Sequence, residues 1–217
     1  MSDRIASAIV LLTLLCSGTA NAEVLFSDNF DPIDSSQWTL TSSVGARGAG
    51  QAGFDFGNAL HFAGYGVRSA TTIPLDLTTG ETIEFDFRGG NEDIDGSLYW
   101  EDVDLGEDAV LEYSTDGTNF TVLDTLDLFQ FRDDSPTTTW LKYTATIPAA
   151  ARTSATQFRW RQLDHNGWRW DEWGIDNVVI LSNSPEPSAW VLFAITGIVM
   201  VFRRTRRTAG AVAASSG

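Results

Sequence analysis

The sequence predicts an all-β protein. We expect one antiparallel β-sandwich of the jelly-roll type, with an N-terminal signal peptide before it and a C-terminal transmembrane helix after it. Short apolar–polar alternations recur between residues 82 and 180, and such period-two patterns are typical of strands with one buried face. The same region shows no helical periodicity of useful length. Two uncharged apolar runs lie outside it, one near each end of the chain.

The first 22 residues have the pattern of a secretory signal peptide. Arg4 precedes an apolar stretch from Ala6 to Cys16, and Ala20-Asn21-Ala22 follows. A charged start, a short apolar region and an Ala-x-Ala cleavage site define such a peptide. We therefore expect residues 1–22 to be removed. Cys16 is the only cysteine, so the mature chain can form no internal disulfide.

Residues 23–183 have the length of a single domain. They contain 27 of the 29 acidic residues but only nine of the 14 basic ones, which gives a net charge of −18. Binding to nucleic acid requires a basic face, so this composition excludes nucleic acid as a partner. The carboxylates suit an exported protein and offer the oxygen ligands that calcium prefers. A solvated acidic surface explains most of them equally well.

The expected strands follow one another with turn residues between them. They cover residues 82–87, 109–114, 120–124, 140–147, 157–161 and 175–180. Asp116-Gly117 separates the second from the third and predicts a hairpin. Residues 149–152 have the composition of a single helical turn. Several short strands with this spacing favour an antiparallel sandwich or jelly roll.

Several segments of this body resemble Reelin-type repeats, within the broader group of concanavalin A-like sandwiches. The segments are Asp28-Asn29-Phe30, Asn58-Ala59-Leu60-His61-Phe62 with Arg68 and Thr72, and residues 107–117, 158–162 and 173–178. The resemblance extends from Phe26 to Ile180. It implies a binding or adhesion module, often with a structural calcium ion and without catalytic activity. Reelin repeats carry cysteines that this chain lacks, so their disulfides are not expected here.

The acidic residues suggest two calcium sites. The resemblance implies that the first and last strands lie close together, which brings Asp28 near Asp176; alternatively, Asp28 opens a turn and Asp176 faces water. In the second candidate, residues 91–102, Asp93 and Asp95 occupy the third and fifth positions and a glycine the sixth, as in a calcium loop. No flanking helices are expected there, and an acidic surface turn is the alternative.

Four tryptophans fall within fourteen residues: Trp160, Trp168, Trp170 and Trp173. Trp160 and Trp173 lie in or beside expected strands and should fill the core. Trp168 and Trp170 follow the expected turn at residues 165–167. An exposed pair there would form a platform for sugar rings, because indole faces stack on them. Packing of both side chains in the core is the alternative.

The chain ends with an apolar run followed by an arginine cluster. Residues 189–202 are uncharged, and fourteen helical residues span about 21 Å. The hydrocarbon core is about 30 Å thick, so a span needs local thinning or snorkelling arginines. The arginines should remain cytoplasmic. The sequence therefore predicts a transmembrane helix at about residues 189–202 and a short cytoplasmic tail at residues 208–217.

Residues 184–207 resemble the PEP-CTERM sorting signal of Gram-negative bacteria. The carrying residues are Pro185, Glu186 and Pro187, then the apolar run, then an arginine cluster that begins with Arg203 and Arg204. The resemblance implies recognition by an exosortase-type membrane protease and cleavage near the Pro-Glu-Pro triplet. It also implies a host that makes extracellular polysaccharide. The ten residues after Arg207 are a departure, because the signal usually ends nearer the arginines.

These features predict an exported, non-catalytic protein. It would be anchored in the inner membrane on the periplasmic side, then sorted to the cell surface or the extracellular matrix, where the sandwich binds polysaccharide or surface proteins. A secreted hydrolase acting on polysaccharide and a structural matrix component without a ligand are the alternatives. His61 and His165 lie far apart in the sequence, and no Gly-x-Ser-x-Gly occurs, so no Ser-His-Asp triad is indicated. His61 alternates with Leu60 and Phe62 and is expected on a strand surface.

Overall fold

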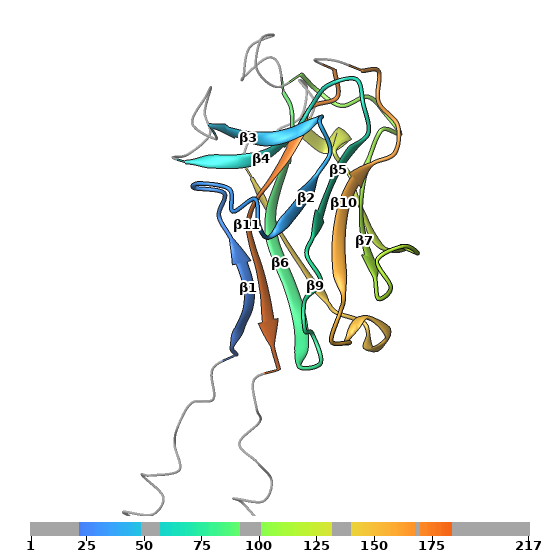
Figure 1. The fold of residues 1–217 in the computed structure, drawn as a ribbon. Helices are drawn as coiled ribbons and strands as arrows, with labels where there is room; N and C mark the ends of the chain where they lie inside the picture. The colour runs from blue at the N-terminus through green and yellow to red at the C-terminus, as the bar shows by residue number, and fades with distance from the viewer. Residues whose placement is uncertain (1–21, 49–56, 92–100, 132–139, 168–169, 184–217) are drawn as a thin grey trace, which may run out of the picture. The chain divides into compact units, whose positions relative to one another are not determined.

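Two antiparallel β-sheets face each other across one apolar core in the computed structural model of this chain (Figure 1). The structure describes residues 22–48, 57–91, 101–131, 140–167 and 170–183. All the described strands lie between Glu23 and Asn183, which form one compact unit. The predicted signal peptide, sorting segment and transmembrane helix lie outside the described residues.

The first sheet contains six strands and the second contains five. In order, the first has β3 (Val44–Gly48), β4 (Asn58–Phe62), β11 (Trp173–Ser182), β6 (Gly80–Gly89) and β9 (Leu141–Thr146), with β1 (Val24–Asp28) also paired to β11. The second has β2 (Trp38–Leu40), β5 (Arg68–Thr72), β10 (Gln157–Gln162), β7 (Ala109–Ser114) and β8 (Thr121–Leu126). Two short 3-10 helices, η1 (Phe129–Phe131) and η2 (Ala149–Ala151), complete the described elements. No helix among the described residues is long and apolar enough to cross a membrane.

Alternating side chains from both sheets build the core. On β6, Ile83 and Phe85 are buried, whereas Glu84 between them is partly exposed. Trp160 of β10 is fully buried and meets Phe85 edge-on, with ring centroids 5.4 Å apart. Contacts of this kind between large aromatic side chains dominate core energetics. The expectation that Trp160 and Trp173 fill the core is confirmed, since both are 0% exposed.

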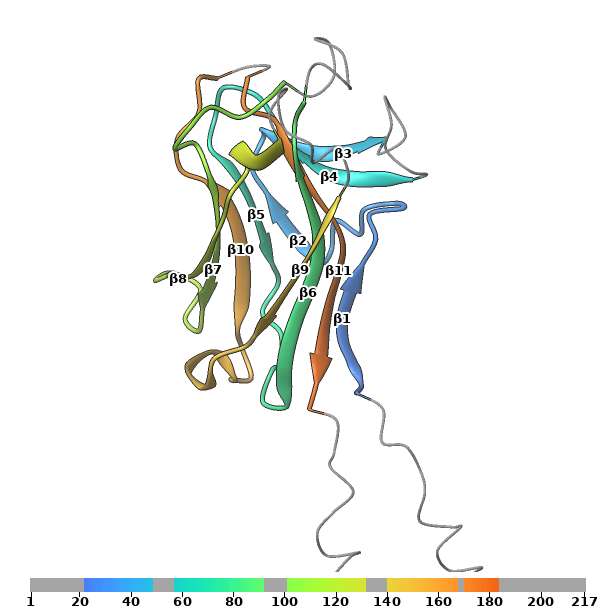
Figure 2. The same ribbon diagram turned by 180° about the vertical axis from the view of Figure 1, so that it is seen from behind.

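Strand β11 brings the two ends of the body together. Its first residues pair with β4, its later residues pair with β1 on the same side, and β6 lies on the other side. The Ser182 amide donates to the Glu23 carbonyl at 2.8 Å. Both ends of the body therefore lie side by side at one end of the sandwich (Figures 1 and 2).

The opposite end of the sandwich is formed by three segments, residues 63–67, 101–108 and 163–172, of which 168–169 are not described. The first segment precedes β5, the second precedes β7, and the third connects β10 to β11. We call this region the loop end. Figure 1 shows it far from the two ends of the body.

The all-β sandwich and the six expected strands are confirmed, with boundaries that differ by at most two residues. The expected hairpin joins β7 and β8, and Gly117 adopts the positive φ of 72° that its turn requires. Residues 149–151 form the expected helical turn as η2. The sequence analysis did not identify β2, β3 or β5. They are short and lack a clear apolar alternation, so pairing with longer neighbours determines them.

Candidate functional site

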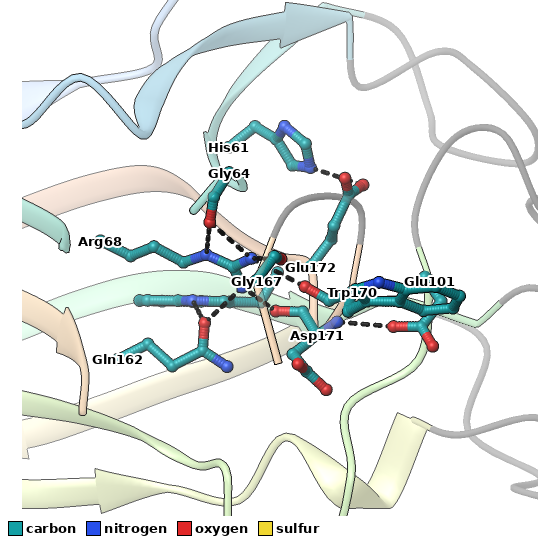
Figure 3. A network of polar contacts seen from close by, with 10 residues as sticks. His61, Gly64, Arg68, Glu101, Gln162, Gly167, Trp170, Asp171 and Glu172 are labelled. Carbon is teal, nitrogen blue, oxygen red and sulfur yellow. Dashed lines mark hydrogen bonds and ion pairs between the residues drawn. The ribbon is translucent and has the colours of Figure 1, made fainter. Parts of the chain in front are cut away.

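A fully buried arginine ties the segments of the loop end together. Arg68, the first residue of β5, is 0% exposed. Its guanidinium donates to four backbone carbonyls and one side-chain oxygen (Figure 3). The acceptors are Gly64 O at 3.1 and 3.2 Å, Gly167 O at 2.6 Å, Trp170 O at 2.8 Å, Asp171 O at 2.5 Å and Gln162 Oε1 at 2.7 Å. One planar group with five donors thus fixes two loops that are distant in sequence.

The charge of Arg68 is compensated from nearby. Burial lowers the pKa of Arg68, and the carboxylates of Asp171, Glu172, Glu107 and Glu101 act in the opposite direction. Because the ordinary pKa of arginine is so high, the guanidinium stays charged. The loop end therefore contains a buried cation surrounded by acidic groups.

Two aromatic side chains project from the segments that Arg68 holds. Tyr65 is 77% exposed and Trp170 is 52% exposed. Gly167 joins them. Its carbonyl accepts from the Trp170 amide at 3.3 Å, and a Cβ on it would lie only 2.9 Å from Cδ1 of Tyr65. The ring of Tyr65 therefore rests on a glycine that also adopts a positive φ of 112°. We call Tyr65 and Trp170 the aromatic platform.

The sequence analysis selected one of these two residues. Trp170 is half exposed beside the expected turn, and Trp168 lies outside the described residues. Tyr65 was not selected. A tyrosine between Gly64 and Gly66 was the available signal, because a large side chain in a glycine-flanked turn has little core to enter.

Three carboxylates lie next to the platform. One carboxylate oxygen each of Asp104, Glu107 and Asp171 lies within 4.8 Å of the other two. This is the one such trio among the residues that the structure describes. Asp171 is 1% exposed and accepts from the amides of Asn166 at 2.6 Å and Asp104 at 3.3 Å. Burial raises the pKa of Glu107 to about 8, and the hydrogen bond to Asp171 and its charge act in the same direction. The sequence analysis missed this trio, because Asp171 joins the other two only through the fold.

The predicted calcium ligands Asp28 and Asp176 lie at a second place, where β1 and β11 pair. Asp28 stands opposite Val178, and Asp176 stands opposite Asp86 of β6. Burial raises the pKa of Asp176 to about 6, and the negative charges of Asp31, Asp86 and Asp28 contribute to the shift. The fold therefore places the two predicted residues in one acidic cluster, together with Asp31 and Asp86, which were not predicted.

The chemistry of this cluster fits a hard divalent cation. Every charge that acts on Asp176 is negative, and carboxylate oxygens are preferred calcium ligands. Asp28 accepts from the Phe30 amide at 2.7 Å on Oδ1, as in the alternative in which it opens a turn, and from Trp38 Nε1 at 2.8 Å on Oδ2. Asp31 Oδ1 accepts from the Asn58 amide at 2.6 Å, and Asp86 Oδ2 from Asn177 Nδ2 at 2.9 Å. Each oxygen that accepts one bond retains a second lone pair for a cation. The four carboxylates do not meet the 4.8 Å spacing of the trio. Binding of one ion by three of them therefore requires side-chain rotation.

Two other expectations have different outcomes. Asp93 and Asp95, of the second calcium candidate, lie outside the described residues. His61 lies on a strand, β4, as expected, but its side chain is only 5% exposed, so the expectation that it faces solvent is wrong. Its Nε2 lies 3.1 Å from Glu172 Oε2. Glu172 immediately precedes β11, which is the neighbour of β4, so its side chain reaches the outer face of that sheet.

The fold places this chain among the jelly-roll β-sandwiches. The chain belongs to the Reelin subrepeat B family, which matches residues 45–181, more than half of its length. It is similar to the K1 cleaved adhesin domain of Lys-gingipain from Porphyromonas gingivalis, with 17% identity, a TM-score of 0.50, and coverage of 73% of this chain and 98% of that one. It is also similar to the CBM22-1 xylan-binding domain of Paenibacillus barcinonensis Xyn10C, with 12% identity, a TM-score of 0.46, and coverage of 78% and 100%. At these identities the likeness concerns the fold alone.

Proposed function

We propose that this chain is an exported, non-catalytic protein of the cell surface or extracellular matrix whose sandwich binds glycan through the aromatic platform. One observation carries this proposal: Tyr65 and Trp170 are exposed on segments that a buried Arg68 holds. Exposed aromatic faces on a rigid support stack on sugar rings with little ordering cost. A fixed support also explains how two large apolar side chains remain in solvent instead of collapsing onto the core.

The position of the platform suits an anchored binding module. Both ends of the body leave at the end opposite the loop end (Figure 1). The platform therefore lies at the end of the body opposite Asn183, after which the predicted anchor at about residues 189–202 follows in the sequence (Figure 1). Export, sorting by an exosortase-type protease and passage through the inner membrane rest on the sequence patterns of residues 1–22 and 184–207. Mass spectrometry of the mature chain tests them, with cleavage expected after Ala22 and near Pro185.

Glycan binding is tested by removing each platform ring. A glycan array with the wild-type protein selects ligands, and calorimetry then compares Trp170→Ala and Tyr65→Ala. Each should lose about tenfold in affinity, because one stacked ring contributes on the order of 1 kcal/mol. Val122→Ala is the matched control, since Val122 is 52% exposed but lies on β8. An equal loss of glycan affinity in all three variants, or no loss of affinity in any of them, would contradict the proposal.

We further propose a structural calcium ion held by Asp28 and Asp176 with help from Asp31 and Asp86. Calcium would join β1, β6 and β11 and offset the repulsion among these carboxylates. An ion bound only by the folded state raises the unfolding temperature through linkage. Thermal unfolding with excess calcium and with excess chelator measures this effect, and coincident curves would remove the ion from the proposal.

The hydrolase alternative has one specific observation in its favour. Glu107, whose pKa is raised to about 8, lies beside Asp171, as in a pair of proton donor and carboxylate. However, Asp171 is 1% exposed and already accepts two backbone amides, so a sugar ring has no access to it. Release of reducing ends by the wild-type protein, abolished in Glu107→Gln, would establish the alternative. Absence of glycan binding together with absence of hydrolysis would favour the structural matrix component.

A further inference from the structure

We infer that the aromatic platform selects a polysaccharide with free amino groups, a cationic amino-sugar polymer such as partly deacetylated poly-N-acetylglucosamine, and rejects polymers of uronic acids. This deepens the proposed function and rests on it. The platform supplies the stacking faces, and the carboxylates around it supply the charge preference.

The described residues of the loop end are strongly acidic. Their carboxylates belong to Glu101, Asp102, Asp104, Glu107, Asp108, Asp164, Asp171 and Glu172. Among the described residues Arg68 is the counter-cation, and it is fully buried, so it offers no charge to a ligand; Arg169, directly before Trp170, lies outside the described residues. Arg161, near the end of β10, is held by Glu112 at 2.9 Å. The histidine of this region also fails to compensate, because burial and then Arg68 lower the pKa of His165.

Hydrogen bonds place these carboxylates in the same segments as Trp170. Glu101 Oε2 accepts from the Asp171 amide at 2.5 Å, directly after Trp170 (Figure 3). Asn166 Nδ2 donates to Asp104 Oδ2 at 3.1 Å. Asp104 and Asp164 are themselves exposed. An exposed charge acts on a bound ligand within the screening length of about 8 Å at physiological salt.

Both elements of the site favour an ammonium group over a carboxylate. The face of an indole or phenol ring attracts cations through its quadrupole, and the exposed carboxylates attract them directly. A uronic acid would bring another negative charge to a region where Glu107 is already crowded by Asp171, Asp104 and Asp164. A ligand cation would relieve this crowding, lower the pKa of Glu107 from about 8, and release protons near neutral pH. A neutral sugar would not.

The test compares three oligosaccharides of equal length on the full chain: one of glucosamine, one of N-acetylglucosamine and one of galacturonate. Calorimetry at slightly acidic pH keeps the amines charged, and two salt concentrations report the contribution of charge. A repeat at neutral pH in two buffers of different ionisation enthalpy reports the release of protons. The glucosamine oligomer should bind about tenfold more tightly than the acetylated one at low salt, with a smaller advantage at high salt. The galacturonate oligomer should not bind.

Local charge is tested by neutral variants. Asp104→Asn and Asp164→Asn should each reduce the preference for glucosamine over the acetylated oligomer by about twofold to threefold, the effect of one exposed charge. Affinity for the acetylated oligomer should change less than affinity for the glucosamine oligomer. Asp76→Asn is the control, because Asp76 is also exposed but lies between β5 and β6 at the other end of the sandwich. An equal loss in Asp76→Asn would assign the preference to total charge and overturn the inference.

The inference and the proposed function fail differently. If the acetylated oligomer binds as tightly as glucosamine, or if galacturonate binds best, the charge preference is wrong while glycan binding stands. If none of the three oligomers binds and the glycan array is also blank, both are overturned.

Discussion

Replacing Arg68 with methionine tests whether one guanidinium holds the loop end together. Methionine retains much of the apolar stem but has no donor and no charge. The change leaves Gln162 Oε1 and the carbonyls of Gly64, Gly167, Trp170 and Asp171 without their shared donor. It also leaves the carboxylates of the loop end without their buried counter-cation.

The expected cost follows from how many of these acceptors water can reach. The carbonyl of Asp171, a residue that is 1% exposed, loses its donor, and a buried acceptor left unpaired costs about 1–3 kcal/mol. Gln162 Oε1 keeps the Trp173 Nε1 donor at 3.1 Å, and the Gly167 carbonyl keeps the Trp170 amide at 3.3 Å, so each loses one of two bonds. The carbonyls of Gly64 and Trp170 lie at partly buried contacts and should recover most of their loss by hydration. Removal of the buried cation saves its desolvation cost but leaves acidic groups uncompensated. We therefore expect a loss of about 3–5 kcal/mol in the free energy of unfolding, as for other broken buried pairs.

Urea unfolding followed by tryptophan fluorescence measures this loss. Arg159→Met is the matched control, since Arg159 is 21% exposed and its partner Glu112 retains Arg161; it should cost about 1 kcal/mol or less. Arg68→Lys should fall between the two, because an ammonium keeps the charge but cannot span the same acceptors. If Arg68→Met costs no more than Arg159→Met, the loop end is held by something other than the guanidinium, and the support assigned to the platform is wrong.

Three further predictions concern the acidic cluster and the hairpin. In the presence of chelator, the free energy of unfolding should fall by about 1–2 kcal/mol as pH rises from about 4 to 7. The reason is that the pKa of Asp176 is about 6 in the folded state against the usual 3.8, so the folded state binds more protons in that window. Urea unfolding across pH measures this change, and a free energy that rises with pH would contradict it. Asp176→Asn should reduce that slope without removing it, because Glu107 also has a raised folded pKa, of about 8. The variant should stabilise the metal-free protein at neutral pH by about 1 kcal/mol and abolish the shift of unfolding temperature with calcium; a retained shift would place the ion elsewhere. Gly117→Ala should lower the free energy of unfolding in urea by about 1 kcal/mol, because Gly117 has a φ of +72° and a Cβ would lie 3.0 Å from Gln157 Oε1. Gly45→Ala is the control and should be neutral, because nothing lies within 4 Å of a Cβ at that position. Equal losses in the two variants would contradict the backbone argument.

The sandwich could be predicted because its longest strands carry local signals. The alternation in residues 82–87 reappears as the buried Ile83, Phe85 and Phe87 of β6. Asp116-Gly117 defined a turn from two residues. The core positions of Trp160 and Trp173 followed from their place in strand patterns. Each of these inferences needs information only from neighbouring residues, so no knowledge of the topology was required.

The site depends instead on pairings between distant residues. Arg68 reaches Asp171, 103 positions away, and Gln162, 94 positions away, and nothing near Arg68 in the sequence indicates that it is buried. Asp28 and Asp176 were predicted to meet only because the family resemblance places the first and last strands together. Asp86 was missed because its proximity to Asp176 depends on the register of β6 against β11. Asp31, in the loop directly after β1, was also missed.

The burial of Arg68 also explains how so acidic a loop end remains folded. A surface arginine would neutralise one carboxylate and would present a positive charge to ligands. The buried guanidinium of Arg68 instead compensates the charges of Asp171 and Glu172. The carboxylates of Asp104 and Asp164 remain exposed to solvent, so their charge is available to a ligand. Arg68 therefore supports the platform mechanically and leaves its surface negative. Arg68→Met should thus weaken binding of neutral and cationic sugars alike, whereas Asp164→Asn should weaken binding of the cationic sugar more than binding of the neutral one, and this difference separates support from charge selection in one set of titrations.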